Sequence, residues 1–329
     1  MKQRSLFIVS LDFELFWGVR DKRTLQSYGA NILGVRRVIP ALLKIFEQYG
    51  ISATFATVGF LFARDREELT EHIPSLKPDY LNSRYSPYNN NYLNSIGFSE
   101  KDDLYHYGES LIQLIQQNGN HEIASHTFSH FYCLENASFA SFRADMSAAK
   151  NIALRYGIEL KTIVFPRNQY ADEHLQICKD LGFIAYRGNE QSSAYRPRKN
   201  DEQSKLIRAT RFADSYLNLT GHHTFNIYDR DVALVNIPAS RFLRPYSPAL
   251  KRLDPIRLKR IKKSMTYAAE NNQCYHLWWH PHNFGINLTE NLSFLEEILK
   301  HYKKLHEQFG MESKNMKIIA QEILEPHAL

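Results

Sequence analysis

The sequence predicts an α/β protein whose strands run parallel. Short apolar runs alternate with longer segments in which apolar residues recur at helical spacing, the order expected of β-α-β units. Polar residues suited to catalysis follow several of these runs, at the edge of a parallel sheet where active sites lie. With 329 residues, 43% of them hydrophobic, the chain can bury a sizeable core.

The strands and helices follow from these patterns in chain order. Residues 5–11 are expected to form the first strand, and residues 35–49 a helix that Gly50 ends. Residues 51–58 give the second strand, after which the regular alternation is interrupted. Beyond the interruption we expect strands at 122–126, 162–165, 183–186, 232–237 and 275–279, and helices at 105–117, 138–156, 172–181, 255–271 and 291–309.

Two long polar insertions break the alternation. Residues 64–104 contain several prolines, three successive asparagines and many tyrosines, and residues 189–230 are rich in polar and charged side chains. Loops of this length in a compact domain are usually functional or disordered. We therefore expect one domain over residues 1–329 whose two insertions, at about 64–104 and 189–230, border the substrate cleft.

Charge and cysteine content restrict the kind of partner and the compartment. The formal net charge is +6, but the basic residues are spread along the chain, which does not indicate a nucleic-acid partner. The three cysteines are far apart in sequence, as suits reduced thiols. No segment resembles a signal peptide or approaches the length of a membrane span. We expect a cytoplasmic protein without a transmembrane segment.

One concentrated basic stretch, residues 257–263, lies in the expected helix 255–271 and has two interpretations. It can be a solvated helix face, as charge runs usually are. It can also contact phosphate on a nucleotide-linked or lipid-linked sugar, or make peripheral contact with a membrane surface. The sequence does not choose between them.

Two histidines four residues apart, His126 and His130, form the most specific local pattern. If the segment turns helically, both imidazoles lie on one face and can ligate one cation. A catalytic zinc-type centre usually takes three protein ligands, so a carboxylate has to come from another segment. The alternative is a pair of surface histidines in a loop, since this spacing is common by chance.

The other polar residues of interest fall just after expected strands. In parallel α/β folds, binding and catalytic groups lie beyond the carboxyl ends of the strands, so we expect these residues to meet in one site. The alternative is that all of these residues belong to solvated loops and have no common function. The residues placed in this way are Asp12, Glu14, His126, His130, Arg167, Tyr170, Arg187, His280 and His282.

Four short segments carry a resemblance to a known family. They are Ser-Leu-Asp-Phe-Glu at 10–14, Ser-His-Thr-Phe-Ser-His at 125–130, Phe-Pro-Arg-Asn-Gln-Tyr at 165–170 and Leu-Trp-Trp-His-Pro-His at 277–282. From residue 5 to about residue 309, outside the insertions, the chain resembles the polysaccharide deacetylases, the NodB-like carbohydrate esterases. The resemblance implies a distorted (β/α) barrel of about seven parallel strands.

The resemblance also implies a divalent metal ion, with zinc as the expected metal. In the first segment one carboxylate is the catalytic base and the other binds the metal, which assigns the base to Asp12 and a metal ligand to Glu14. Phe13 separates the two, as in the Asp-x-Glu variant of the motif. The second segment supplies His126 and His130 as the imidazole ligands.

The remaining two segments imply catalytic groups around the metal. In the third, Arg167 orients the base and Tyr170 offers its backbone N–H to the oxyanion. Here a proline precedes the arginine, which departs from the family's Arg-x-Pro-Tyr order. In the fourth, His280 is the general acid, and His282 is a rival for that role.

Together these assignments predict a metal-dependent deacylase. The expected reaction removes an acyl group, taken to be N-acetyl, from a carbohydrate such as a precursor of a surface polysaccharide. A first alternative is a hydrolase of N-formyl groups or other non-peptide linear amides with the same metal chemistry. A second is a non-catalytic sugar-binding protein on the same scaffold, which the presence of every expected site residue disfavours.

Overall fold

The computed structural model describes residues 4–199, 202, 204–227 and 234–325. The strands are β1 (Leu6–Phe13), β2 (Ala53–Thr57), β3 (Glu122–Ser125), β4 (Thr162–Ile163), β5 (Ala185–Tyr186), β6 (Val235–Asn236), β7 (Arg241–Phe242), β8 (Cys274–Trp279) and β9 (Glu312–Ser313). The helices are α1 (Leu25–Tyr49), α2 (Arg66–Glu71), α3 (Tyr92–Ser95), α4 (Glu109–Asn118), α5 (Phe139–Leu154), α6 (Asp172–Asp180), α7 (Lys205–Asp214), α8 (Asp254–Glu270), α9 (Leu288–Phe309) and α10 (Met316–Leu324).

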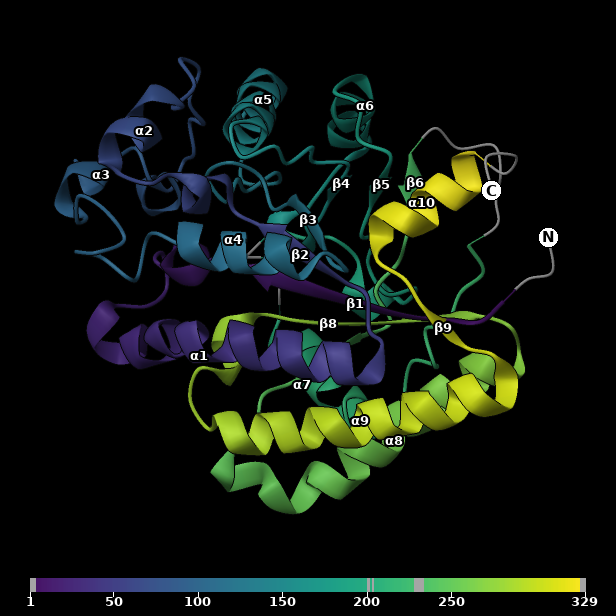
Figure 1. The fold of residues 1–329 in the computed structure, drawn as a ribbon. Helices are drawn as coiled ribbons and strands as arrows, with labels where there is room; N and C mark the ends of the chain where they lie inside the picture. Colours follow the sequence, from purple (N-terminus) through teal and green to yellow (C-terminus); the bar gives the residue numbers. More distant parts are fainter. Residues whose placement is uncertain (1–3, 200–201, 203, 228–233, 326–329) are drawn as a thin grey trace.

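The strands form one curled sheet of parallel pairs. Its order is β6-β5-β4-β3-β2-β1-β8-β7, and the short β9 pairs with the start of β1. Helices cover the outside, with α8 and α9 side by side below the sheet and α5 and α6 above it in Figure 1. In the part of the chain that the structure describes, β6 and β7 do not pair, so the barrel stays open between them.

The central strand β1 explains why the site forms at one end of the barrel. Its residues alternate between two sides, as strand geometry requires. Phe7 and Val9 pack under the helices, whereas Leu6 and Ile8 belong to a second apolar cluster that also contains residues of α10. Continuing the second side toward the carboxyl end gives Ser10 and then Asp12, which are buried but polar. This side of β1 therefore changes from apolar to polar where the catalytic residues begin.

Helix α1 packs against the outside of the sheet and brings the segment after β8 into position. Gly34 in α1 faces Gly285 so closely that a Cβ on Gly34 would lie 2.0 Å from the carbonyl oxygen of Gly285. A side chain at either glycine would push the turn after β8 away from the helix. Gly50 ends α1 in the left-handed conformation, at φ 66°.

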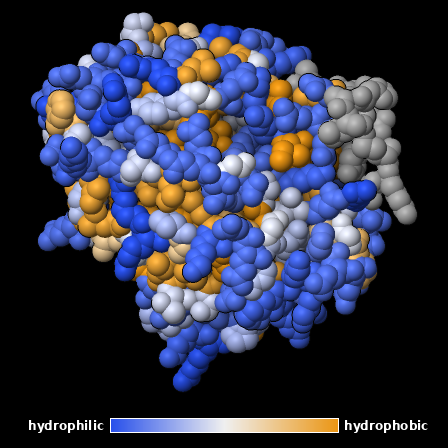
Figure 2. All heavy atoms as spheres, in the orientation of Figure 1, coloured by the Kyte–Doolittle hydropathy of each residue, from blue (hydrophilic) through white to orange (hydrophobic). Residues whose placement is uncertain are grey.

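The surface agrees with this layered packing. Figure 2 shows that hydrophilic side chains cover most of the visible face, with apolar side chains gathered in recesses between them. No helix of the described chain has the length and apolar character needed to cross a membrane. The three cysteines are buried and free.

The α/β class and the barrel of parallel strands are confirmed. The expected strands at 5–11, 51–58, 122–126, 162–165, 183–186 and 275–279 correspond to β1 to β5 and β8, and that at 232–237 to β6, although residues 232 and 233 lie outside the described part. The prediction missed β7, β9, α2, α3, α7 and α10. Two-residue strands carry no readable period, and α7 lies in a stretch whose polarity suggested a loop.

Glu122 gives a test of the fold that is independent of the catalytic site. Its buried carboxylate accepts hydrogen bonds from the hydroxyls of Thr54 at 2.8 Å and Thr162 at 2.6 Å and from the backbone N–H of Lys317 at 2.9 Å, joining β2, β3, β4 and α10. Glu122→Ala leaves these donors without their acceptor, so we expect the free energy of unfolding to fall by about 2–5 kcal/mol in urea denaturation. Glu122→Gln, which keeps one acceptor oxygen, should lose less. Wild-type stability of the alanine variant would contradict this account.

Candidate active site

A cavity of about 710 Å³ opens at the carboxyl ends of the strands. Asp12 and Glu14 enter it from the end of β1, His130 from the loop after β3, and His280 and His282 from the turn after β8. The structure therefore brings residues that follow different strands together in one cavity, as expected.

Glu14, His126 and His130 come together as a possible metal site. Their candidate ligand atoms lie within 4.8 Å of one another, and all three side chains are buried. The Glu14 Oε2 atom is 3.3 Å from His126 Nε2 and 3.1 Å from His130 Nε2. Burial raises the pKa of Glu14, but His280, His126 and His130 outweigh it and hold this pKa well below its usual value. Glu14 is thus ionised, as a metal ligand must be.

The donor atoms of this triad fit a divalent cation. The carbonyl oxygen of Val164 can only accept, so His126 donates its Nδ1–H to it at 2.8 Å. The Nε2 atom, 3.3 Å from Glu14 Oε2, is then the nitrogen available to a metal ion. Gly18 keeps the pocket open, since a Cβ there would lie 1.9 Å from the Glu14 side chain. One carboxylate and two imidazoles are also the donor set of known catalytic zinc sites.

The loop that carries the histidines is not a helix, contrary to the helical turn considered from the spacing. Thr127 and His130 adopt left-handed backbone conformations, with φ of 64° and 58°. Asp145 of α5 holds the loop: its carboxylate accepts the backbone N–H groups of Phe128 at 2.7 Å and Ser129 at 3.2 Å, and also the Ser129 hydroxyl. Burial raises the pKa of Asp145 to about 7, although these hydrogen bonds oppose the shift.

Arg187 holds Asp12 in a bidentate ion pair. The Arg187 Nη1 and Nη2 atoms donate to Asp12 Oδ1 at 2.6 Å and Oδ2 at 2.8 Å. Arg187 follows β5, so it reaches across the inside of the curled sheet to β1. Burial raises the pKa of Asp12, but Arg187, His126 and His280 lower it more, and the net pKa is below its usual value. Asp12 is therefore an oriented, ionised carboxylate.

The prediction that Arg167 orients Asp12 is wrong in this structure. Arg167 lies in the short turn Pro166–Asn168 with a positive φ of 57°, and this turns its side chain toward Asp21, with which it pairs. Its guanidinium stacks on Tyr132, 3.8 Å from the ring centre. Arg167 lines the cavity without a hydrogen bond to Asp12, and Arg187 takes the orienting role that was expected of Arg167.

Tyr170 is not among the residues that line the cavity. Its ring packs 5.1 Å from Phe165 and 5.4 Å from Tyr186, measured between ring centres. The geometry gives its expected oxyanion role no support. Asn168 lies at the cavity instead, and its Oδ1 accepts a hydrogen bond from Arg187 Nη2 at 2.9 Å.

The two histidines after β8 differ in exposure. His280 is 23% exposed, and its Nε2 lies 3.7 Å from both Asp12 Oδ2 and Glu14 Oε1. His282 is buried and stacks on His280 at 5.0 Å between ring centres. Burial, with the nearby charge of His280, lowers the pKa of His282 to about 3. His280 is thus the better placed of the two to exchange protons with a bound molecule.

Sequence reasoning missed the support of the Asp12–Arg187 pair. His276 donates its Nδ1–H to the Pro238 carbonyl at 3.2 Å, so its Nε2 accepts the Ser10 hydroxyl at 2.8 Å. Ser10 in turn accepts from Arg187 Nη1 at 3.0 Å. The position of Ser10 two residues before Asp12 was the available signal, because both face the same side of a strand.

The two insertions behave differently. Among the described residues, only the insertion 189–230 lines the cavity, through Glu190, Tyr195 and Arg208 among others. Residues 200, 201, 203 and 228–230 of this insertion lie outside the described part. The expectation that 64–104 borders the cleft is wrong for this cavity, because its tyrosines pack on one another and on Tyr132.

The basic stretch 257–263 also does not line the cavity. Arg257 and Arg260 are buried: Arg257 pairs with Asp254, and Arg260 donates to Asn218 and to the Gly221 carbonyl. These arginines hold α8 and its neighbouring loops together, so the phosphate contact considered for this stretch gains no support.

Residues 29–186, which contain both histidines of the metal triad, match the polysaccharide deacetylase family. The predicted resemblance to the polysaccharide deacetylases is therefore confirmed over this range. Asp12, Glu14, Arg187 and His280 lie outside the matched range, so their placement rests on the geometry. None of the curated proteins matches the sequence.

Solved structures agree on the fold. A Mycobacterium smegmatis protein described as a polysaccharide deacetylase has a TM-score of 0.60 at 12% identity, over 98% of this chain and 91% of that chain. A similarly described protein from Pseudomonas aeruginosa PAO1 gives 0.56 at 11% identity, over 99% and 92%. The Puue allantoinase gives 0.53 at 13% identity, over 98% and 91%. At these identities the likeness shows the fold alone.

Proposed function

We propose that the protein is a metal-dependent hydrolase that removes an acyl group, N-acetyl in the first place, from a carbohydrate. The observation that carries the proposal is the metal triad Glu14, His126 and His130 in one cavity with the oriented carboxylate of Asp12. The family match supports a carbohydrate substrate. A surface-polysaccharide precursor as substrate and a cytoplasmic location are parts of the proposal, and the free cysteines suit a reducing compartment.

Each residue then has a defined task. A divalent ion held by the triad, which we propose to be zinc, would polarise the acyl carbonyl and make a nearby water more acidic. Asp12 would accept the proton of the attacking water, while Arg187 keeps its carboxylate ionised and aimed. His280 would donate a proton from its cavity-facing ring to the departing amine.

The direct test combines metal analysis with acyl release. Purified protein should contain close to one divalent metal ion per chain and should release acetate from N-acetylated sugars, with loss of both after chelation. Because an allantoinase shares the fold, N-formyl sugars and allantoin belong among the test substrates. Hydrolysis of allantoin alone, measured by its disappearance because the ring opening releases no acyl group, would replace the sugar substrate. No hydrolysis of any of these substrates by metal-loaded protein would favour the non-catalytic alternative.

The roles of His280 and His282 can be separated by the leaving group. His280→Ala should reduce kcat for an N-acetyl sugar by roughly 10² to 10⁴, because an amine leaves only when protonated. The same variant should lose far less on 4-nitrophenyl acetate, whose leaving group needs no acid. His282→Ala should show no such difference between substrates. If the amide-selective loss follows His282 instead, the general acid has been assigned to the wrong ring.

A further inference from the structure

The cavity that holds the metal triad is strongly cationic. Nine Lys and Arg side chains line it within the described residues, against three carboxylates. Two of the charged groups are neutralised locally, since Asp12 pairs with Arg187 and Arg167 pairs with Asp21. We call five of the remaining cations the cationic cluster: Lys22, Arg196, Arg208, Arg241 and Arg244.

Arg244 and Arg208 have no carboxylate partner among the described residues. Arg244 donates from Nε to the Ser215 hydroxyl at 2.8 Å and lies 5.1 Å over the ring centre of Phe212, which fixes its direction without neutralising it. Burial lowers the pKa of Arg244, Tyr216 and Tyr195 offset this only in part, and the like charge of Arg241 lowers it further. The guanidinium groups of Arg241 and Arg244 are thus close enough for their like charges to repel each other.

Arg241 has a buried guanidinium group, and some of its N–H donors have no acceptor among the described residues. It is 4% exposed, and its Nη1 donates to Asp214 Oδ2 at 2.6 Å and to the Asp214 carbonyl at 3.0 Å. Its Nε and Nη2 atoms are buried without a hydrogen-bond acceptor in the part of the chain that the structure describes. Buried donors of this kind are rare unless a ligand or water accepts from them.

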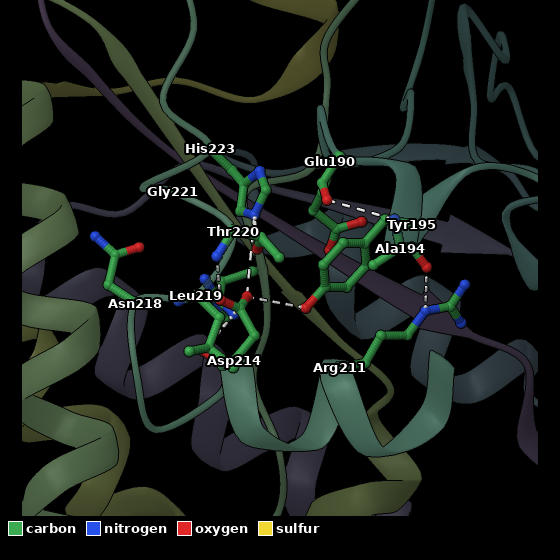
Figure 3. Close-up of polar contacts among 12 residues, drawn as sticks. Glu190, Ala194, Tyr195, Arg211, Asp214, Asn218, Leu219, Thr220, Gly221 and His223 are labelled. Carbon is green, nitrogen blue, oxygen red and sulfur yellow. Dashed lines mark hydrogen bonds and ion pairs between the residues drawn. The ribbon is translucent and has the colours of Figure 1, made fainter. Parts of the chain in front are cut away.

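Asp214, at the end of α7, fixes the second insertion beside these arginines. Its Oδ1 accepts the backbone N–H groups of Leu219 and Thr220 at 3.0 Å each, and its Oδ2 accepts the Tyr195 hydroxyl at 3.1 Å (Figure 3). Arg211 of α7 donates a hydrogen bond from Nε to the Ala194 carbonyl at 2.7 Å, and Figure 3 shows these two residues side by side. The insertion is therefore anchored to β7 through the same carboxylate that holds Arg241.

We infer that the cationic cluster is a subsite for a phosphate-type anion carried by the substrate. One guanidinium group can donate two parallel hydrogen bonds to two phosphate oxygens. Arg241 and Arg244 are already held by Asp214 and Ser215, so they lose little freedom when they bind an anion. A carboxylate brings one negative charge, whereas a phosphate or diphosphate brings two or more. The larger charge suits a cluster in which, among the described residues, only Arg241 is paired with a carboxylate, that of Asp214. The inference rests on the proposed function, because it places the acyl sugar and its phosphate in one cavity.

The first experiment measures binding of inorganic pyrophosphate to the full-length, metal-loaded protein by calorimetry. Arg208→Gln and Arg244→Gln should each raise the dissociation constant about tenfold or more, and added salt should weaken binding to the wild type. Arg37→Gln is the matched control, because Arg37 is an exposed arginine of α1 that does not line the cavity. Melting temperatures of all variants check that the fold is intact.

Several outcomes of this titration would overturn the inference. They are absence of pyrophosphate binding at low salt, equal binding by all three variants, and equal competition by glucuronate, which carries a carboxylate alone. Competition by uridine diphosphate in solution would support a nucleotide-linked substrate. Arginine-dependent retention on vesicles that contain phosphatidic acid would support a lipid-linked one, and either result supports the phosphate subsite.

The second experiment compares acyl release from N-acetylglucosamine 1-phosphate and from its uncharged methyl glycoside. The wild type should show a kcat/KM at least about tenfold higher for the phosphate, and Arg244→Gln should remove this advantage through KM alone. Equal kcat/KM for both sugars overturns the subsite but leaves the proposed function in place. Arginine-dependent pyrophosphate binding without acyl release from any sugar overturns the proposed function and leaves the subsite.

Discussion

Asp12→Asn should retain the metal ion and lose roughly 10² to 10⁴ in kcat, since it removes only the general-base step. The side chain keeps its size, and Asp12 belongs neither to the metal triad nor to its supporting hydrogen bonds. Metal content by elemental analysis and kcat on an N-acetyl sugar are the two measurements. Asp180→Asn, which removes an exposed carboxylate paired with Arg143, is the control and should keep full activity.

Glu14→Gln is the contrasting variant. An uncharged amide is a poorer ligand than a carboxylate, so this change should weaken metal binding, and excess metal should restore part of the activity. Excess metal should restore none of the activity lost in Asp12→Asn. Metal loss in Asp12→Asn together with metal retention in Glu14→Gln would show that the two carboxylates have exchanged roles.

His126→Ala and His130→Ala should each abolish both metal binding and activity. Each change removes one of three ligands, and the two that remain do not hold a catalytic ion firmly. The fold should persist, because Asp145 holds the loop through backbone N–H groups that both variants keep, although His126→Ala also loses the hydrogen bond to the Val164 carbonyl. Elemental analysis, kcat and a thermal melt together measure the result.

A matched control for these variants is His72→Ala, which removes an imidazole at the end of α2, outside the cavity. It should keep the metal and the activity of the wild type. Unchanged metal content in both His126→Ala and His130→Ala would refute the ligand assignment.

The sequence was sufficient to predict which strand ends meet, because that depends on local patterns and a general rule for parallel sheets. Apolar runs locate β1, β3 and β8, and their carboxyl ends must lie at the same edge of the sheet. The side chains of Glu14, His130 and His280 therefore share one cavity, as predicted. The adjacent tryptophans of β8 lie on opposite sides of the strand, with Trp279 in the core and Trp278 at the cavity.

What could not be predicted depends on long-range geometry. Arg167 and Arg187 both follow strands, and only the curl of the sheet decides which of them reaches Asp12. The left-handed backbone of Arg167 turns it away, and a single sequence carries no signal for that conformation at an arginine. Helix α7 was missed for a related reason, since Asp214 anchors it through contacts with Tyr195 and Arg241 rather than through a broad apolar face.

The hydrogen bonds that Asp145 accepts from the loop carrying His126 and His130 have a consequence for the proposed metal binding. Left-handed conformations at Thr127 and His130 are unfavourable for residues with a Cβ, and a free loop would leave them readily. The carboxylate of Asp145 offsets this strain before any ion arrives, so the conformational entropy of the loop is already lost in folding rather than in ion capture. We therefore expect the two imidazoles to keep fixed directions before and after an ion binds, so the metal preference of the site should follow the bond angles that these directions allow.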